Sequence, residues 1–368
     1  MTMILLAPRK YVQGRDAMRG IGQCLEPIGK KPVVLWGKTT KSVVSQTVLE
    51  SCAQAQVEVV DVDFNGETTK AESERVAEIV REASADAVVG IGGGKAIDAA
   101  KAAAHFADVA MVTVPTIASN DSPTSSFTVW YDEDHKFCGF ESWGRNPDLV
   151  LVDTQVVAQA PINTFIAGIG DALSTWVEAE ACYKTHSGNL AGGTATLAAM
   201  AIAKLGFDTL FEHAAEALRA VEAKVVTPAV EKVTEANVLH SGLGFESCGV
   251  ATAHMIANAL NDYEQCHDQM HGHKVGFGVI SQLCLDPDMS VEQMHRIVDF
   301  EIATGLPVTF ADLGLDGVSR EQLKPIGDIC AGEGSLCAVH NFEVTSDSIV
   351  DAMIAADRLG NERRAAAR

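Results

Sequence analysis

The chain has 368 residues, of which 47% are hydrophobic, and carries a formal net charge of -21. This length exceeds what one hydrophobic core usually serves, so we expect two domains. The strong negative charge argues against nucleic acid or an anionic membrane surface as a partner, because either would need a basic patch.

The nine cysteines form no C-x-x-C pair and no framework spacing. Buried free thiols of a reduced compartment therefore fit better than disulfides. The first eight residues contain too short an apolar run for a signal peptide, and no segment approaches the length of a membrane span. We therefore expect a cytoplasmic protein with no membrane partner.

Short apolar runs alternate with helical segments through the first half of the chain. Strands are predicted at 31–36, 57–64, 85–89, 109–114 and 149–152, helices at about 40–53, 70–84 and 96–106, and a hairpin at 127–140. Because such alternation needs crossover connections, the sheet should be parallel, with helices on both faces. Ligands of such sheets bind outside the carboxyl ends of the strands.

The turn between the third strand and its helix reads Gly-Ile-Gly-Gly-Gly-Lys-Ala-Ile-Asp over residues 90–98. Glycines there let the backbone approach a ligand closely or adopt a positive φ. An anion suits the helix N-terminus, where N–H groups and the positive end of the helix dipole meet. Lys95 can reach a phosphate, and Asp98 lies one turn into the helix. We interpret this turn as a nucleotide pyrophosphate site, with close packing of helix against strand as the alternative.

A second loop leaves the carboxyl end of the strand at 109–114. Residues 115–125 read Pro-Thr-Ile-Ala-Ser-Asn-Asp-Ser-Pro-Thr-Ser, which is rich in hydroxyl groups and contains one acidic residue. This composition suits hydrogen bonds to a ribose or a nicotinamide. It is also the usual composition of a surface loop, so both interpretations stay open.

Beyond about residue 161 strand signals are nearly absent, and a helical domain is predicted. Helical stretches are expected at 174–181, 193–210, 213–223, 229–239, 250–260 and 346–356. Asp171 at an expected helix start, His254 in an apolar helix and His271 at another helix start supply one carboxylate and two imidazoles. That is the ligand set of a catalytic Zn²⁺ or Fe²⁺ site. Taken singly, these residues are more often a helix cap, a core histidine and a surface histidine, so other ligand combinations stay open.

The order and spacing of these motifs resemble those of the glycerol dehydrogenases, in the iron-containing alcohol dehydrogenase superfamily. The similarity is carried by residues 90–98, 115–121, 167–172, 253–254 and 271–275, and it extends from residues 10–14 to about 357. It implies the dehydroquinate synthase-like fold. A Rossmann-like α/β dinucleotide-binding domain would span residues 1–160 and an all-α metal- and substrate-binding domain residues 161–368, with the metal in the cleft between them.

The resemblance also implies roles for single residues. Asp171, His254 and His271 would bind zinc, with iron as the alternative, and Asp121 would reach the substrate hydroxyls. The cofactor would be bound by Gly92, Gly93, Gly94, Lys95, Asp98, Thr116, Ser119, Ser125, Phe127 and Tyr131, with Gly94 and Lys95 at its phosphates and Asp98 near its nicotinamide. The implied activity is hydride transfer between a small polyol and NAD, converting glycerol to dihydroxyacetone, in a homo-oligomer that is often an octamer.

Three positions depart from the family pattern. Gly37 stands where glycerol dehydrogenases usually carry an aspartate that binds the adenosine ribose and repels a 2′-phosphate. With two lysines nearby, we expect relaxed cofactor choice or a preference for NADP. Ala257 replaces a second histidine one turn after His254, and His273 replaces a glutamate, so the preferred alcohol can differ from glycerol.

Three other functions stay open on the sequence. Another alcohol or hydroxycarboxylate dehydrogenase of the superfamily would use the same site. A dehydroquinate synthase would need a basic cluster for its phosphorylated substrate, and the candidate pocket segments offer few Arg or Lys beyond Lys274. A non-catalytic nucleotide-binding regulator could keep the fold, but the retention of all three presumed metal ligands argues against it.

Overall fold

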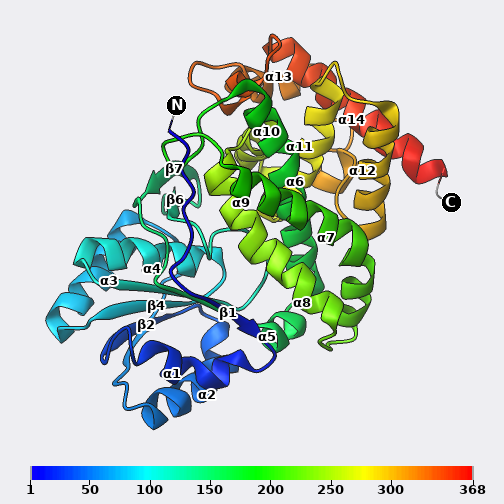
Figure 1. Cartoon of the computed structure of the whole chain (residues 1–368). Helices are drawn as coiled ribbons and strands as arrows, with labels where there is room; N and C mark the ends of the chain where they lie inside the picture. The colour runs from blue at the N-terminus through cyan, green and yellow to red at the C-terminus, as the bar shows by residue number, and fades with distance from the viewer. Residues whose placement is uncertain (1, 367–368) are drawn as a thin grey trace. The chain divides into compact units, whose positions relative to one another are not determined.

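The computed structural model describes residues 2–366, which form two compact units (Figure 1). The α/β unit comprises Leu6–Phe165 and Arg219–Gly242, and the helical unit comprises the residues before Leu6, Ile166–Leu218 and the residues from Leu243 onward. The segment 219–242 thus packs with the α/β unit although it lies in the second half of the sequence. The boundary expected at residue 160 concerns domains that fold separately, and it stays a prediction.

A six-stranded sheet forms the centre of the α/β unit. Its strands are β1 (Tyr11–Gly14), β2 (Pro32–Trp36), β3 (Val60–Asp63), β4 (Ala87–Gly92), β5 (Ala110–Pro115) and β8 (Leu149–Asp153), in the order β1-β8-β5-β4-β2-β3. Every neighbouring pair is parallel, as predicted. The predicted hairpin forms a separate antiparallel pair of β6 (Phe127–Tyr131) and β7 (Phe137–Ser142).

Helices cover both faces of this sheet. They are α1 (Ile21–Leu25), α2 (Thr40–Gln54), α3 (Lys70–Ala83), α4 (Gly94–Ala107) and α5 (Thr154–Gln159). Val34 and Trp36 of β2 pack in one core cluster with residues of α1 and α2, whereas Val33 and Leu35 pack in another with residues of α3 and α4. Figure 1 shows these two helix pairs on opposite sides of the strands. Burial on both faces explains why the strands read as continuous apolar runs.

Edge strand β1 is an element that the sequence did not indicate. Its four residues, Tyr-Val-Gln-Gly, are all half-buried, and they pair with β8. A strand this short, containing a glutamine and a glycine, has no alternating pattern that distinguishes it from a loop.

The helical unit is built mainly from eight helices of the described chain. They are α6 (Ile162–Thr185), α7 (Leu197–Glu222), α9 (Ser241–Cys248), α10 (Thr252–Ala259), α11 (His271–Leu285), α12 (Val291–Thr304), α13 (Arg320–Cys330) and α14 (Ser346–Ala366). The two stretches predicted at 193–210 and 213–223 form the single helix α7. One core cluster joins α10, α11, α12, α13 and α14. The predicted helical second half is thus confirmed.

The segment between α7 and α9 is also helical. It consists of α8 (Pro228–Glu235) and a π-helical turn, Ala236–His240. The stretch predicted as a helix at 229–239 is therefore helical, with a change of hydrogen-bonding pattern at Ala236.

All nine cysteines are free thiols, as their spacing predicted. In the part of the chain that the structure describes, no helix combines the length and the apolar character needed to cross a membrane.

Glu301 on α12 is a buried acid that serves neither predicted site. Its side chain is 0% exposed, and neither carboxylate oxygen has a hydrogen-bond partner among residues 2–366. Desolvation by burial raises the pKa of this carboxyl well above its ordinary value of 4.5. The group is therefore protonated in the folded protein over a pH range in which it ionises in the unfolded chain.

We predict that Glu301→Gln becomes increasingly stabilising, relative to the unsubstituted protein, as the pH rises. Between the unfolded and the raised folded pKa, the unfolded chain has lost this proton and the folded chain retains it. The free energy of unfolding therefore falls with rising pH, by up to about 1.4 kcal/mol per pH unit. The uncharged amide of glutamine should remove this pH dependence of the free energy of unfolding. Urea unfolding from about pH 5 to about pH 8 measures it, with the exposed Glu292→Gln of the same helix as control. Identical slopes for the two proteins would contradict a protonated Glu301.

Candidate active site

The glycine turn lies at the carboxyl edge of the sheet, where β4 passes into α4. None of the glycines at 90–94, all within the described chain, has a positive φ. A Cβ at Gly90 would lie 2.6 Å from the Cβ of Ala100, and one at Gly94 would lie 2.7 Å from Nδ2 of Asn120. Close packing of α4 against the strand therefore requires Gly90, whereas a side chain at Gly94 would have to displace the amide of Asn120. The N-terminus of α4 still lies at this edge, so an anion site there is compatible with the packing.

Lys95, predicted to bind a phosphate, is held by a carboxylate that the sequence did not indicate. Its Nζ lies 2.6 Å from Oε2 of Glu67 and 4.8 Å from the centroid of the Tyr131 ring. Desolvation raises the pKa of Glu67, but hydrogen bonds from Lys95 and His135 outweigh it and leave that pKa below its ordinary value. Glu67 is therefore ionised at neutral pH. The signal that could have found it is its place in the loop after β3, at the same edge of the sheet.

Asp98 lies in a buried polar network. Its Oδ1 is 2.9 Å from Nζ of Lys101 and accepts a hydrogen bond from Oγ of Ser122 at 2.5 Å, while Oδ2 accepts one from the Val129 N–H at 2.9 Å. Lys101 is 0% exposed and also donates to backbone carbonyls within residues 122–127. This ion pair ties the hydroxyl-rich loop to α4. A lysine three residues after Asp98, in an otherwise apolar helix, was the available signal for it.

The hydroxyl-rich loop is not a plain surface loop. Its candidate residues Thr116, Ser119, Asp121, Ser125 and Phe127 are each at most 9% exposed. Tyr131, further along, is half-buried, and its N–H donates to the carbonyl of Thr68 at 3.0 Å. The loop and the strand that follows it are therefore ordered against the rest of the unit.

The π-helical turn 236–240 holds the same loop from its other side. Nδ2 of Asn237 donates to the carbonyl oxygens of Ala118, at 3.1 Å, and Phe165, at 3.2 Å. Oγ1 of Thr124 donates to the carbonyl of Val238 at 2.9 Å. These bonds help to explain why residues 219–242 pack with the α/β unit. Turns of this type occur frequently at functional sites.

Gly37 lies directly after β2, and its N–H donates to the carbonyl of Ile91 at 2.9 Å. Of the two nearby lysines, Lys41 is paired with Asp61 at 2.5 Å and Asp63 at 2.7 Å, whereas Lys38 is exposed. Much of the local positive charge is thus balanced by the acidic end of β3.

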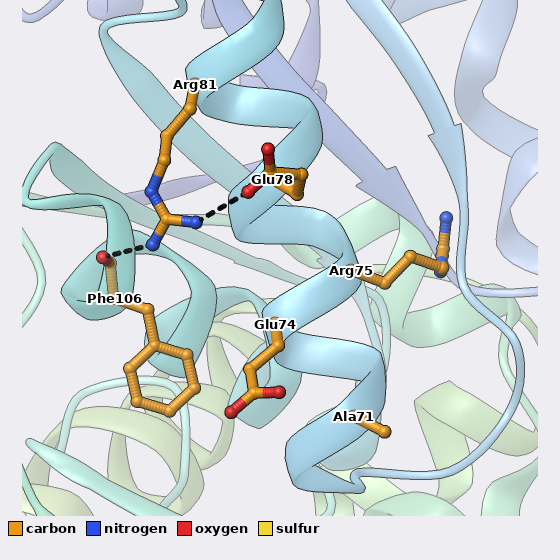
Figure 2. Close-up of a pocket in the computed structure, with 6 residues that line it drawn as sticks. All are labelled: Ala71, Glu74, Arg75, Glu78, Arg81 and Phe106. Carbon is orange, nitrogen blue, oxygen red and sulfur yellow. Dashed lines mark hydrogen bonds and ion pairs between the residues drawn. The ribbon is translucent and has the colours of Figure 1, made fainter.

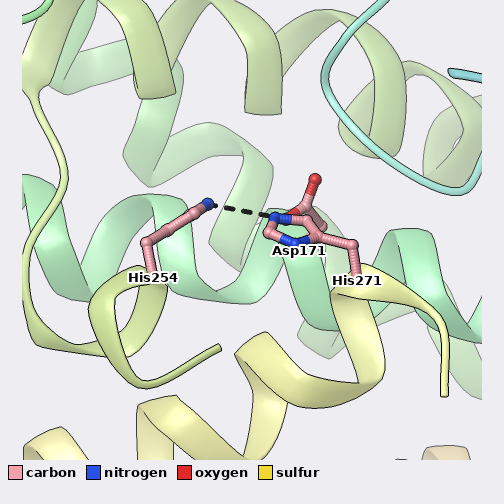
Figure 3. Close-up of side chains that lie close together, drawn as sticks. All are labelled: Asp171, His254 and His271. Carbon is pink, nitrogen blue, oxygen red and sulfur yellow. Dashed lines mark ion pairs between the residues drawn. The ribbon is translucent and has the colours of Figure 1, made fainter. Parts of the chain in front are cut away.

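Asp171, His254 and His271 come together in the helical unit (Figure 3), from α6, α10 and the first residue of α11. Their ligand atoms all lie within 4.8 Å of one another. Oδ1 of Asp171 is 3.7 Å from Nε2 of His254 and 3.5 Å from Nε2 of His271. One carboxylate oxygen and two imidazole nitrogens so arranged fit a Zn²⁺ or Fe²⁺ ion. The structure thus assembles the predicted trio.

The expectation that Asp171 stands at a helix start is wrong. Helix α6 begins at Ile162, so Asp171 lies well inside it and cannot cap it. The neighbouring glycine has a packing role. A Cβ at Gly170 would lie 2.2 Å from the carbonyl oxygen of Gly272, and one at Gly272 would lie 1.8 Å from that of Ala167. The two glycines allow α6 and α11 to touch beside Asp171 and His271.

Glu178 orients His254 and was not predicted. Its Oε2 lies 2.5 Å from Nδ1 of His254, and its Oε1 accepts the N–H groups of Ala251, at 2.9 Å, and His254, at 3.0 Å. With Nδ1 engaged in this way, Nε2 is the nitrogen left to bind a metal. Glu178 lies two helical turns after Asp171 on the same face of α6, and that spacing was the available signal.

His271 is suited to bind a metal as a neutral imidazole. Its side chain is 36% exposed, so part of the ring lies at the protein surface. The surrounding protein nevertheless desolvates the ring, and with the charges of His254 and Lys274 this lowers the pKa of His271 to about 3. The ring nitrogens therefore do not need to lose a proton before a metal binds at neutral pH.

A separate surface hollow runs along α3 (Figure 2). It is lined by Ala71, Glu74, Arg75, Glu78, Arg81 and Phe106. Arg81 spans it by donating to Oε2 of Glu78 at 3.0 Å and to the carbonyl of Phe106 at 2.8 Å. Phe106 belongs to the last turn of α4, the end opposite the glycine turn. The hollow contains no residue that the sequence predicted for cofactor or metal.

The chain is similar to known proteins of one family over most of its length. The iron-containing alcohol dehydrogenase family model matches residues 8–154. The chain is 40% identical over 364 residues to the glycolaldehyde reductase of Halobacterium salinarum, covering 99% of this chain and 100% of that protein. It is 41% identical over 360 residues to the glycerol dehydrogenase of Thermotoga maritima, covering 97% of each. The structure of glycerol dehydrogenase from Schizosaccharomyces pombe matches with a TM-score of 0.94 and 32% identity, covering 100% of this chain and 93% of that one.

The chain belongs to the iron-containing alcohol dehydrogenase family. Within that family it is a glycerol dehydrogenase-like oxidoreductase, with a six-stranded parallel α/β domain and a helical domain. The family and the fold expected from the order of the motifs are confirmed.

We predict that Glu178→Gln lowers the affinity for Zn²⁺ by roughly 10- to 100-fold, because such partners orient the ligating histidine and raise its basicity. Competition with a chromophoric chelator measures the affinity without any substrate. Glu180→Gln, two residues along the same helix, is the control and should leave zinc binding unchanged. Equal zinc affinities for Glu178→Gln and the unsubstituted protein would contradict this role.

Proposed function

We propose that this protein transfers a hydride between a small polyol and a nicotinamide cofactor, and that it oxidises glycerol to dihydroxyacetone with NAD. The proposal is carried by the trio of Asp171, His254 and His271, in a chain that is similar over its full length to glycerol dehydrogenases. A Zn²⁺ ion bound there, with Fe²⁺ as the alternative, would act as a Lewis acid that makes an alcohol easier to deprotonate.

In this proposal each residue of the metal site has a separate task. Asp171 supplies negative charge, and His254 and His271 bind through neutral imidazoles. Glu178 keeps Nε2 of His254 directed at the ion. Asp121, which is 9% exposed, orients the substrate by accepting hydrogen bonds from its hydroxyl groups.

The cofactor would bind at the carboxyl edge of the sheet. Gly92, Gly93 and Gly94 with the N-terminus of α4 would hold the pyrophosphate, and Lys95 would pair with it. The rest of the cofactor would contact Thr116, Ser119, Ser125, Phe127 and Tyr131. Because both carboxylate oxygens of Asp98 are engaged within the chain, we propose that it acts by fixing the 122–129 segment beside the nicotinamide.

A second reaction of the same type is supported by the similarity to the glycolaldehyde reductase of Halobacterium salinarum. Reduction of a small hydroxyaldehyde to a diol is the reverse of the oxidation of a small diol at a primary hydroxyl group, and it uses the same hydride chemistry as glycerol oxidation. In both reactions a hydride passes between the carbinol carbon and the nicotinamide, and a proton passes to or from the oxygen. Ala257 and His273, on the helices that carry His254 and His271, are candidates for setting the choice between these substrates.

We also propose that the enzyme is a cytoplasmic homo-oligomer. Its free thiols suit a reduced compartment. On α7, Leu197 is 75% exposed and Leu205 is 53% exposed, which is apolar surface of the kind that subunit contacts cover.

Removal of the metal should abolish glycerol-dependent reduction of NAD, and added Zn²⁺ should restore it. Asp171→Asn should lower the rate at saturating zinc by roughly 100-fold or more, because it removes the ligand charge that balances the ion. NADH binding, followed by fluorescence, should survive both treatments, because its residues lie in the other unit. Full activity after chelation would contradict the metal site, whereas zinc binding without glycerol activity would direct the search to glycolaldehyde.

Gly37→Asp should shift cofactor preference toward NAD, by roughly tenfold in the ratio of kcat/KM values, because a carboxylate there would repel a 2′-phosphate. We expect the unsubstituted enzyme to accept both cofactors, since Lys41 is already paired. A Cβ at Gly37 would lie 3.2 Å from Oγ1 of Thr40 and 3.4 Å from Cα of Gly92, so the new side chain needs only a small displacement of Thr40. Gly37→Ala is the control for added bulk. An unchanged ratio in Gly37→Asp would contradict this role.

A further inference from the structure

The carboxylate of Glu67 is fixed in place. Its Oε1 accepts the N–H of Thr68 at 2.9 Å. Its Oε2 accepts a hydrogen bond from Lys95 at 2.6 Å and lies 2.5 Å from Nδ1 of His135, in the turn between β6 and β7. Only 10% of its side chain is exposed. Three neighbours therefore hold one buried anion at the carboxyl edge of the sheet.

The ammonium of Lys95, by contrast, lies partly in solvent. Its side chain is 46% exposed and ends 4.8 Å from the centroid of the Tyr131 ring. Its backbone carbonyl accepts a hydrogen bond from Oγ1 of Thr68 at 2.9 Å, which fixes the main chain beside Glu67. A lysine side chain is a flexible stem with a point charge at its end, so the ammonium can turn to a second anion while the backbone stays in place.

We propose that Glu67 sets the affinity of the cofactor site by competing with the cofactor pyrophosphate for the ammonium of Lys95. This inference rests on the proposed function, in which Lys95 binds those phosphates. When the pyrophosphate arrives, Lys95 either leaves Glu67 or is shared between two anions, and both outcomes weaken cofactor binding. His135 stays beside the carboxylate and keeps it hydrogen-bonded when Lys95 turns away.

The consequence is a cofactor that exchanges readily. Release of product limits the turnover of many well-evolved enzymes. A carboxylate that competes for the phosphate-binding lysine raises the dissociation rate of the cofactor. Glu67 thus lowers the affinity for the cofactor and speeds its release, although it does not contact the reacting atoms.

Glu67→Gln tests the inference, because it keeps the shape of the side chain and removes its charge. We expect the variant to bind NADH roughly three- to tenfold more tightly and to release it more slowly. Fluorescence titration and stopped-flow displacement measure both quantities without substrate. Glu74→Gln removes one charge from the outer face of α3 in the same unit (Figure 2) and should leave the affinity unchanged. Glu67→Asp, which keeps the charge, should bind more like the unsubstituted protein.

A second pair of variants separates competition from a general effect of charge. Lys95→Met should bind NADH more weakly, and adding Glu67→Gln to it should change nothing, because the competition needs the ammonium. Unchanged or weaker binding by Glu67→Gln alone would overturn the inference, and so would an equal gain with and without Lys95. A protein that binds neither NADH nor NADPH, before any substitution, would overturn the proposed function and this inference with it.

Discussion

Two carboxylates buried in an apolar helical unit set the conditions that the metal site must meet. The side chains of Asp171 and Glu178 are both 0% exposed. Burying an ionised carboxylate costs several kcal/mol unless hydrogen bonds and opposite charge compensate it. Glu178 is compensated by the N–H groups at the start of α10 and by His254. Asp171 faces two imidazoles, one of which, His271, is kept neutral by its surroundings. A divalent cation is the partner that would balance the remaining charge.

Glycines bring the three ligand-bearing helices close enough to share one ion. Gly170 and Gly272 let α6 and α11 touch beside Asp171 and His271. A Cβ at Gly278 would lie 2.4 Å from the carbonyl oxygen of Ala253, so this glycine brings α11 against α10 at the residue before His254. Any larger residue at these positions would push one ligand away from the other two. The close packing of these helices therefore also fixes the positions of the metal ligands.

The α/β unit uses ion pairs in two different ways, and exposure decides between them. The pair of Asp98 and Lys101 is 7% and 0% exposed, and its remaining polar atoms bind the loop that follows β5. Such a pair cannot be broken without leaving a buried charge, so it acts as a structural tie. Lys95 is 46% exposed beside the nearly buried Glu67, so its ammonium can pair with another anion instead. The first pair fixes the loop after β5, where we propose the cofactor binds, and the second can pair with another anion.

Local pattern was enough to predict much of the molecule. Strand and helix periods located β2, β3, β4, β5 and β8 and the helices α2, α3 and α4, but not the short helices α1 and α5. Alternation alone required a parallel sheet. The edge strand β1 was not predicted, because four residues are too few to show an alternating pattern. For the site, chemical type made Asp171, His254 and His271 one of several possible ligand sets, and the resemblance of the motif order to a known family singled them out. These inferences succeed because periodicity and motif order are properties of contiguous residues.

The sequence by itself therefore determined the strand and helix pattern and the position of the glycine turn, and the resemblance of its motifs to a known family gave the three predicted metal ligands. Only the tertiary structure decided that Asp171 lies inside a helix, that residues 219–242 pack with the α/β unit, and that Glu178, Lys101 and Glu67 hold His254, Asp98 and Lys95. Each of these facts depends on burial or on a contact between side chains. Partners such as Glu178 and His254 lie far apart along the chain, and local periodicity does not encode which distant residue a polar atom will meet once water is excluded.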